Sequence, residues 1–250
     1  MFRSKRSPTR ATRWSPETRE TGADHGETRS GRDAPREGRI TSLKPQQRDP
    51  DRINVFLDGQ FAFGLHHDLV LEAGLSPGME VDEELSESLL GRDLVRQAIS
   101  AALNLLAYRS RAEGEIRTRL RQRGFPAGAI DECIDKLRDW RYLDDQDFAE
   151  RWIENRLEQR PRSARMIAME LRGKGVEAST VTDAVNRAGI DERTDALRIA
   201  AERWGRLSGL DRQVRQRRIT GFLSRRGYGF DVIRDVLKEL EADNLEVESE

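Results

Sequence analysis

Cysteine, histidine and aromatic residues are scarce in this chain of 250 residues, and each shortage narrows its possible functions. The single cysteine, Cys133, cannot build a disulfide framework and is typical of a protein from a reducing compartment. The three histidines, His25, His66 and His67, share no ligand spacing with Cys133, which argues against a zinc site. The sequence also lacks the glycine-rich loop that cradles nucleotide phosphates. We therefore expect a protein that is not an enzyme and has no cofactor or metal.

Long hydrophobic runs are absent as well. No segment approaches the length of a membrane-spanning helix, and the N-terminus lacks the apolar core of a secretory signal. Hydrophobic and charged residues each make up 36% of the chain, a balance that suits a string of small bundles better than one thick globule. We expect a soluble, monomeric protein of the cytoplasm.

One pattern occurs three times, about fifty residues apart. Two apolar residues four positions apart are followed by a glycine and then by a second apolar pair. The copies are Ile116-Leu120-Gly124-Ile130-Ile134, Ile167-Leu171-Gly175-Val181-Val185 and Ile219-Leu223-Gly227-Ile233-Leu237. In each copy an arginine, namely Arg109, Arg160 or Arg212, stands fifteen residues before the glycine. Three matched copies predict a tandem-repeat architecture.

The spacings within one copy predict three short helices. The apolar pair lies on one helix face, and the glycine ends that helix in a left-handed conformation. A second apolar series follows, and a third amphipathic stretch precedes each pair, at residues 98–108, 148–157 and 197–207. The last two helices resemble a helix-turn-helix unit. Because one such bundle buries little surface, we expect neighbouring repeats to stack into an elongated array.

The chain thus divides into six predicted parts. Residues 1–39, with nine Arg and one Lys against six acids, form a disordered tail. Residues 40–84 form a small β-rich unit around the hairpin signal Asp58-Gly59. The fold is mainly α overall: the three helical repeats occupy residues 85–145, 146–191 and 192–243, and an acidic tail, 244–250, follows.

Basic residues gather on the middle helix of each repeat and just before it, whereas the acids concentrate elsewhere. Repeated at one position of stacked bundles, these cations could form a discontinuous stripe that binds a polyanion. An ordinary solvated helix face is the competing interpretation. The predicted binding residues are Arg109, Arg111, Arg117, Arg121, Arg160, Arg162, Arg165, Arg172, Lys174, Arg212, Arg215 and Arg218.

Several motifs in succession resemble those of the RecX family of bacterial RecA regulators. The strongest covers Tyr142, Leu143, Asp144, Asp145, Phe148, Ala149 and Trp152. The segments 108–116 and 160–176 resemble further family motifs, and the resemblance extends over about residues 96–242. The Asp-Gly hairpin resembles an N-terminal β extension of some members. The first repeat departs from the pattern, because Ala112 stands where the second has Ser163.

The resemblance implies a non-catalytic protein that binds RecA and the RecA filament on single-stranded DNA. There it would limit filament growth, strand exchange and ATP hydrolysis, and so regulate recombinational repair and the SOS response. A helix-turn-helix DNA-binding regulator acting without RecA is one alternative, although the helices carry mainly Arg and acids instead of the Asn and Gln that read bases. A generic nucleic-acid-binding structural protein, with weak sequence-independent DNA binding, is another.

Individual positions allow further expectations. We expect Phe148, Trp152 and Trp204 to pack in helical cores. Tyr142 and Leu143 should wedge between repeats.

Helix ends and one short segment complete the predictions. Asp144 and Asp145 should cap the following helix, and Ser110 should cap the first repeat's middle helix in place of Ala112. The segment 226–230 imitates the start of an RNA-recognition signature, but the repeat register places it at a corner between helices.

Overall fold

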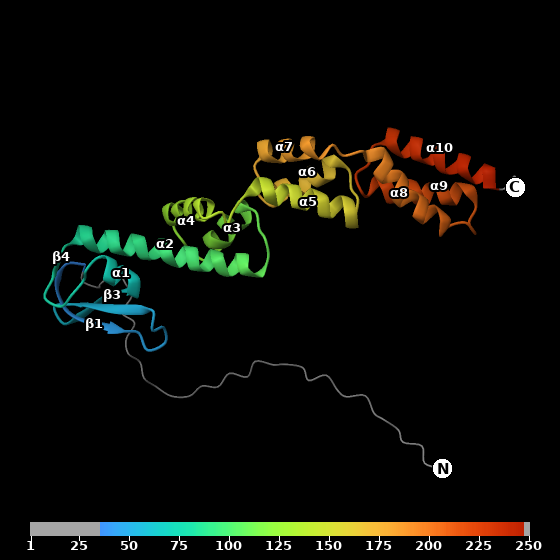
Figure 1. Cartoon of the computed structure of the whole chain (residues 1–250). Coiled ribbons are helices and arrows are strands. Elements are labelled where there is room, and N and C mark those ends of the chain that lie inside the picture. Colours follow the sequence, from blue (N-terminus) through green and yellow to red (C-terminus); the bar gives the residue numbers. More distant parts are fainter. Residues whose placement is uncertain (1–35, 248–250) are drawn as a thin grey trace, which may run out of the picture.

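The computed structural model describes residues 36–247, so most of the predicted N-terminal tail and residues 248–250 lie outside the described part. The molecule is elongated: a small β unit at one end is followed by three helical bodies in a row (Figure 1). This arrangement confirms the predicted fold of a β unit and three tandem three-helix repeats.

The β unit is a four-stranded antiparallel sheet in the order β3-β2-β1-β4. Its strands are β1 (Gly38–Pro45), β2 (Arg52–Leu57), β3 (Gln60–His66) and β4 (Glu80–Val81). Asp58 and Gly59 join β2 to β3 with φ angles of 47° and 83°, as the Asp-Gly signal predicts for a two-residue hairpin turn. The inner sheet face packs against helix α1 (His67–Glu72) and the start of α2 (Glu83–Tyr108), with Val55, Leu57 and Leu65 in the core.

Helix α2 joins the β unit to the first repeat. Its first half contributes Leu89 to the core of the sheet, and its second half contributes Ala98 and Ala102 to the core of the repeat. Between them Asp93, only 2% exposed, accepts hydrogen bonds from the Arg52 guanidinium and the His66 backbone N–H, each at 2.8 Å. A buried carboxylate is tolerated when it is paired in this way, and the pairing fixes the helix to the sheet.

The remaining helices form the repeats. They are α3 (Glu113–Gln122) and α4 (Ala127–Asp139) with α2; α5 (Asp145–Gln159), α6 (Ala164–Gly173) and α7 (Ala178–Ala188); and α8 (Glu192–Gly205), α9 (Arg212–Ser224) and α10 (Phe230–Val247). Each repeat has its own hydrophobic core. The three turn glycines, Gly124, Gly175 and Gly227, have φ angles of 86°, 85° and 89°, as the repeat pattern predicts.

A close backbone contact joins the first two repeats. Gly175, in the turn of the second repeat, lies on Gly114 at the start of α3, so closely that a Cβ atom on Gly175 would fall 2.7 Å from the Gly114 Cα. Beside this contact, Asp145 Oδ1 accepts a hydrogen bond from the Glu113 N–H at 2.8 Å. The carboxylate of one repeat thereby satisfies a free N–H group at the helix end of the previous repeat.

The second and third repeats meet in the same way. Gly227 lies on Ser163, which precedes α6, and the Ser163 N–H donates to the Arg226 carbonyl at 3.0 Å. Glu192, the first residue of α8, accepts from the Ala164 N–H at 2.8 Å. We call these two contacts the first and second joints. Their recurrence explains why the repeats form one continuous array.

A carboxylate on the last helix of the third repeat links that helix to α9. Glu241 on α10 accepts hydrogen bonds from the Arg212 guanidinium at 2.7 and 3.1 Å and from the side chain of Gln216. Gln216 stands in the third repeat at the position of Glu113 in the first and Ala164 in the second. Helix α10 has 18 residues, compared with 13 in α4 and 11 in α7.

The joint makes a testable prediction through two glycines in equivalent turns. Gly175→Ala introduces a methyl group against backbone, whereas Gly124→Ala introduces it where no other atom lies within 4 Å. Both variants carry the strain of a positive φ, about 1–2 kcal/mol, but only G175A adds an overpacking cost of about 1–3 kcal/mol. We expect the thermal unfolding midpoint to fall further for G175A than for G124A. Equal losses would contradict the close joint.

Candidate binding surface

Five of the twelve predicted binding residues are exposed and have no acidic partner among the side chains of residues 36–242. They come from all three repeats. These residues are Arg121, Arg160, Arg165, Arg172 and Arg218. Their guanidinium groups are available to an anionic ligand, so these positions best match the predicted surface.

Five others are held in ion pairs, so the expectation that the acids lie away from them is wrong. Each partner comes from the same repeat, except that Lys174 approaches Glu115 across the first joint. The pairs are Arg109–Glu115 at 2.9 Å, Arg117–Glu113 at 2.7 Å, Arg162–Glu170, Lys174–Glu115 at 3.8 Å and Arg212–Glu241 at 2.7 Å. The Arg212 hydrogen bond lowers the pKa of Glu241 below its ordinary value, which keeps that pair charged.

The last two predicted residues are turned inward. Arg111 donates from Nε to the Leu105 carbonyl at 3.1 Å. Arg215 is only 8% exposed, and its guanidinium carbon lies 4.0 Å from the centre of the Trp204 ring. Both residues are placed to stabilise their repeats.

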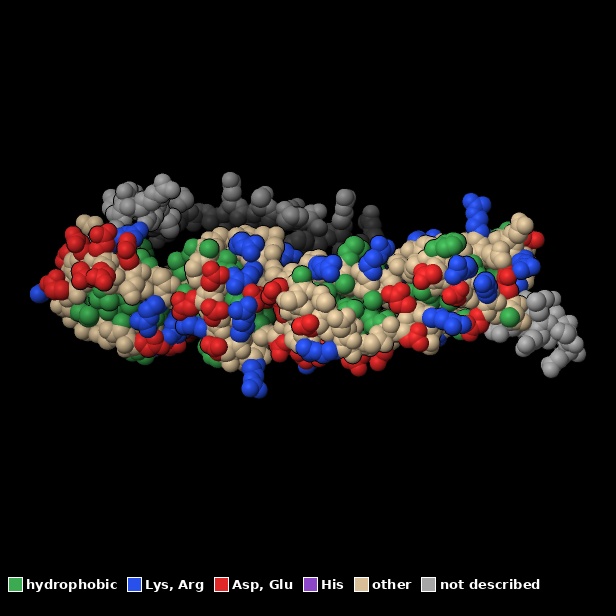
Figure 2. Space-filling model, turned by 90° about the horizontal axis from the view of Figure 1, so that it is seen from above, with side chains coloured by type: hydrophobic (Ala, Val, Ile, Leu, Met, Phe, Trp, Pro, Cys, Tyr) green, Lys and Arg blue, Asp and Glu red, His purple; other side chains and the backbone are tan. Residues whose placement is uncertain are grey.

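Basic and acidic side chains alternate along the face of the molecule seen in Figure 2. This face carries no continuous cationic stripe. The exposed, unpaired arginines therefore lie apart from one another, and a long polyanion would contact each of them separately.

The family motif residues are mainly structural. Leu143 is buried in the core of the first repeat, and Phe148 and Ala149 are buried in that of the second. Trp152 is half-buried and donates from Nε1 to Glu170 at 3.0 Å. The prediction for Tyr142 is wrong: it is 57% exposed and does not wedge between repeats, because the buried position at this corner belongs to Leu143.

Trp204 confirms the prediction of core packing, at 6% exposure. The segment 226–230 lies at the corner between α9 and α10, as the register predicts, and not in a strand.

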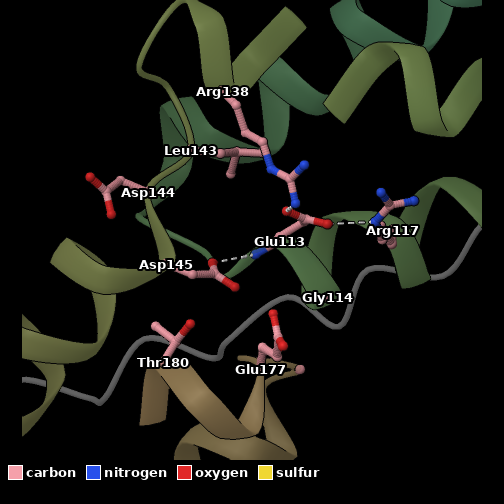
Figure 3. Close-up of a pocket in the computed structure, with 10 residues that line it drawn as sticks. Glu113, Gly114, Arg117, Arg138, Leu143, Asp144, Asp145, Glu177 and Thr180 are labelled. Carbon is pink, nitrogen blue, oxygen red and sulfur yellow. Dashed lines mark hydrogen bonds and ion pairs between the residues drawn. The ribbon is translucent and has the colours of Figure 1, made fainter. Parts of the chain in front are cut away.

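The two aspartates of the motif act on different helices. Asp144 caps α5, because its Oδ1 accepts from the Asp147 N–H at 3.0 Å. Asp145 is the first residue inside α5 and points instead at Glu113 on α3 (Figure 3). The prediction that both cap the following helix is therefore half wrong.

The proposed role of Ser110 is wrong as well. Ala112 precedes α3 and offers no side-chain cap. Its side chain is fully buried in the core of the second repeat. This position therefore needs a small apolar residue, and Asp145 supplies the missing acceptor.

A hollow of about 360 Å³ opens beside the first joint, between α3 and the start of the second repeat (Figure 3). Arg117 and Arg138 face acids within it, and Arg138 pairs with Glu113 at 2.5 Å. Elsewhere, burial raises the pKa of the Cys133 thiol to about 11, which keeps it protonated. Nowhere in residues 36–247 do three or more His, Cys, Asp or Glu side chains gather as they would around a metal ion.

The sequence interpretation missed two arginines at the second joint. Arg203 on α8 and Arg226 before the turn glycine lie over the Phe222 ring, with guanidinium carbons 4.7 and 4.6 Å from its centre. Together with Arg160 and Arg162 they form what we call the joint cluster. The sequence contains one pattern that points to Arg226. A basic residue stands immediately before each turn glycine, namely Arg123, Lys174 and Arg226.

The burial of Asp145 predicts how folding stability changes with pH. Burial raises its pKa above the ordinary aspartate value, against the hydrogen bond from the Glu113 N–H, which lowers it. Ionisation therefore costs folding stability as the pH rises through the aspartate range. Asp145→Asn removes this cost and keeps an oxygen acceptor, so we expect D145N to match or exceed the wild type in urea unfolding at pH 7. Asp145→Ala loses the acceptor and should cost about 1 kcal/mol.

Near pH 3 the advantage of D145N should shrink, since the aspartate is then protonated in both states. If D145N were as unstable as D145A at pH 7, the negative charge itself would be the stabilising feature.

None of the helices in the described part combines the length and the apolar character needed to cross a lipid bilayer.

Comparison with known proteins covers the β unit and each repeat in turn. Four family models match: the RecX N-terminal domain at residues 38–82 and the first, second and third RecX three-helix domains at residues 98–137, 144–185 and 191–237. The chain is 32% identical to a regulatory protein RecX of Bacillus velezensis over 82% of its length and 78% of that relative. It is 30% identical to one of Clostridium botulinum over 80% of its length and 95% of that relative.

Solved structures agree with the fold. A crystal structure of a regulatory protein RecX matches 79% of this chain and 98% of that one with a TM-score of 0.62, at 24% identity. The RecX of Lactobacillus salivarius matches 60% of this chain and 99% of that one, with a TM-score of 0.54. Fold, domain order and sequence therefore agree that the chain belongs to the RecX family of regulatory proteins.

Proposed function

We propose that this protein binds RecA and its filament on single-stranded DNA, and that it restrains filament growth, strand exchange and ATP hydrolysis without a catalytic step of its own. It would act in the cytoplasm, as a monomer, in the regulation of recombinational DNA repair and the SOS response. The succession of four RecX family domains along one chain carries this proposal.

The shape of the molecule supports it. Three repeats in a row offer a long, narrow body that could lie along a groove and touch several filament subunits at once (Figure 1). Exposed arginines without acidic partners occur in every repeat, so each could attract the polyanionic filament. The division of the chain at residues 84, 145 and 191 stays a prediction, and α2 runs across the first of these boundaries.

A helix-turn-helix regulator that reads duplex DNA is supported less well. Its reading helices would be α4, α7 and α10, the second members of the helix pairs. The surface of α4 carries four acids against two basic residues. The starts of α3 and α6 are covered by the joints. Repulsion between the acids of α4 and the DNA phosphates would oppose entry of this helix into a groove.

The first test is ATP hydrolysis by RecA on single-stranded DNA, titrated with this protein. We expect inhibition at fewer than one protein per RecA subunit, because a body that spans several subunits can block growth from few positions. Excess naked DNA serves as the control: relief of inhibition in proportion to added DNA would indicate competition for the lattice and favour a generic nucleic-acid-binding protein. No inhibition at equimolar amounts would contradict the proposal.

The second test uses one exposed, unpaired arginine from each repeat. The triple variant Arg121→Glu, Arg172→Glu, Arg218→Glu should weaken co-sedimentation with RecA filaments by about tenfold or more, because each reversal turns attraction into repulsion. The matched control, Arg151→Glu, Arg187→Glu, Arg234→Glu, makes the same change of net charge at exposed arginines that are already paired with acids. Equal losses in both variants would show that only net charge matters. Circular dichroism should show unchanged helix content in both.

A further inference from the structure

The joint cluster gathers four arginines where the second and third repeats meet. Arg160 and Arg162 precede α6, Arg203 lies on α8, and Arg226 ends the segment after α9. They come from three separate parts of the chain that the joint brings together. The cluster therefore exists only in the assembled array.

Firm contacts hold the cluster in place. Arg226 donates from Nη1 to the Pro161 carbonyl at 2.8 Å and lies over the Phe222 ring. Arg203 lies over the same ring. Stacking on a ring face leaves the in-plane N–H groups of a guanidinium available as donors. The arginines are thus oriented, and their remaining donors are unsatisfied by these contacts.

Three of the four charges are not neutralised. Glu170 pairs with Arg162, but Arg160, Arg203 and Arg226 have no acid within ion-pair distance among residues 36–242, whose side chains the structure describes. Burial and the neighbouring cations Arg162, Arg160 and Arg203 lower the pKa of Arg226 below its ordinary value, against an opposing effect of Tyr228. Residues 160–226 as a whole contain 16 Arg and Lys against 8 Asp and Glu. A bound anion would relieve this repulsion.

We propose that the joint cluster binds the phosphate backbone of single-stranded DNA. Within the filament, this joint would then be where the protein meets the DNA; that setting rests on the proposed function, but the DNA contact itself does not. The interaction would be independent of base sequence, because guanidinium groups contact phosphates and not base edges.

Phosphate suits the cluster better than a carboxylate-rich protein surface does. Protein interfaces are anchored by exposed apolar or aromatic side chains surrounded by a polar rim, whereas nucleic-acid interfaces are polar and positively charged. In the cluster, Pro161 is buried and Phe222 is half-buried beneath the arginines, so neither forms an exposed apolar anchor.

The test measures binding of the full chain to a labelled oligothymidylate by fluorescence anisotropy, without RecA and across a salt series. Arg160→Glu with Arg203→Glu should weaken binding by about tenfold or more at low salt and flatten the salt dependence, since each lost phosphate contact lowers the slope by about 0.7. Arg226 is left unchanged because it also holds Pro161. Arg160→Lys with Arg203→Lys should keep most of the affinity, which separates lost charge from a fold defect.

The matched control is Arg151→Glu with Arg234→Glu, which changes the net charge equally at exposed arginines outside the cluster. It should bind DNA within about twofold of the wild type. Wild-type affinity in R160E/R203E would overturn the inference. The inference would also be overturned if R160E/R203E lost its affinity for a polyglutamate peptide and kept its affinity for DNA. The cluster would then be a protein-binding site.

The two proposals fail separately. If the wild type does not inhibit RecA but R160E/R203E loses DNA affinity, the filament proposal falls and the joint cluster stands. If the wild type inhibits RecA but R160E/R203E keeps its DNA affinity, the joint-cluster proposal falls and the filament proposal stands.

Discussion

The contact between a glycine turn and the start of a neighbouring helix holds this molecule together. Each three-helix repeat buries little surface in its own core, and the joints add shared surface between repeats. Gly175 and Gly114 allow two backbones to touch, and Ala112 passes from the first repeat into the core of the second. The carboxylate of Asp145 then satisfies an N–H group that burial at the joint would otherwise leave without a partner.

The first and third repeats are fixed by different contacts on the sides that face away from the second repeat. At the N-terminal end, Gly124 has no neighbouring repeat to lie on, and α2 runs instead into the β unit, where Asp93 fixes it to the sheet. On the outer side of the third repeat, Glu241 on α10 binds Arg212 and Gln216 and fixes α10 to α9.

Much of the fold could be predicted from the sequence, because the repeat pattern reports contacts within each repeat. Spacing identified the helices, the turn glycines and the Asp-Gly hairpin. It could not identify the partners of Arg109 or Arg212, since an ion pair depends on which helix faces which. Asp145 was misassigned for a related reason: next to Asp144 it looks like a second cap, and only the joint turns its carboxylate toward the preceding repeat. The exposure of Tyr142 is equally a property of the corner and not of the local pattern.

The repeat register also explains why the basic residue before the turn glycine has an acidic neighbour at one joint and not at the other. A basic residue precedes each turn glycine, at a helix C-terminus where a cation is favourable. At the first joint this residue is Lys174, and Glu115 of the preceding repeat lies 3.8 Å away. At the second joint it is Arg226, but the position that corresponds to Glu115 is Met166. The residue before the turn glycine therefore has an acid 3.8 Å away at the first joint and none at the position of Met166 at the second.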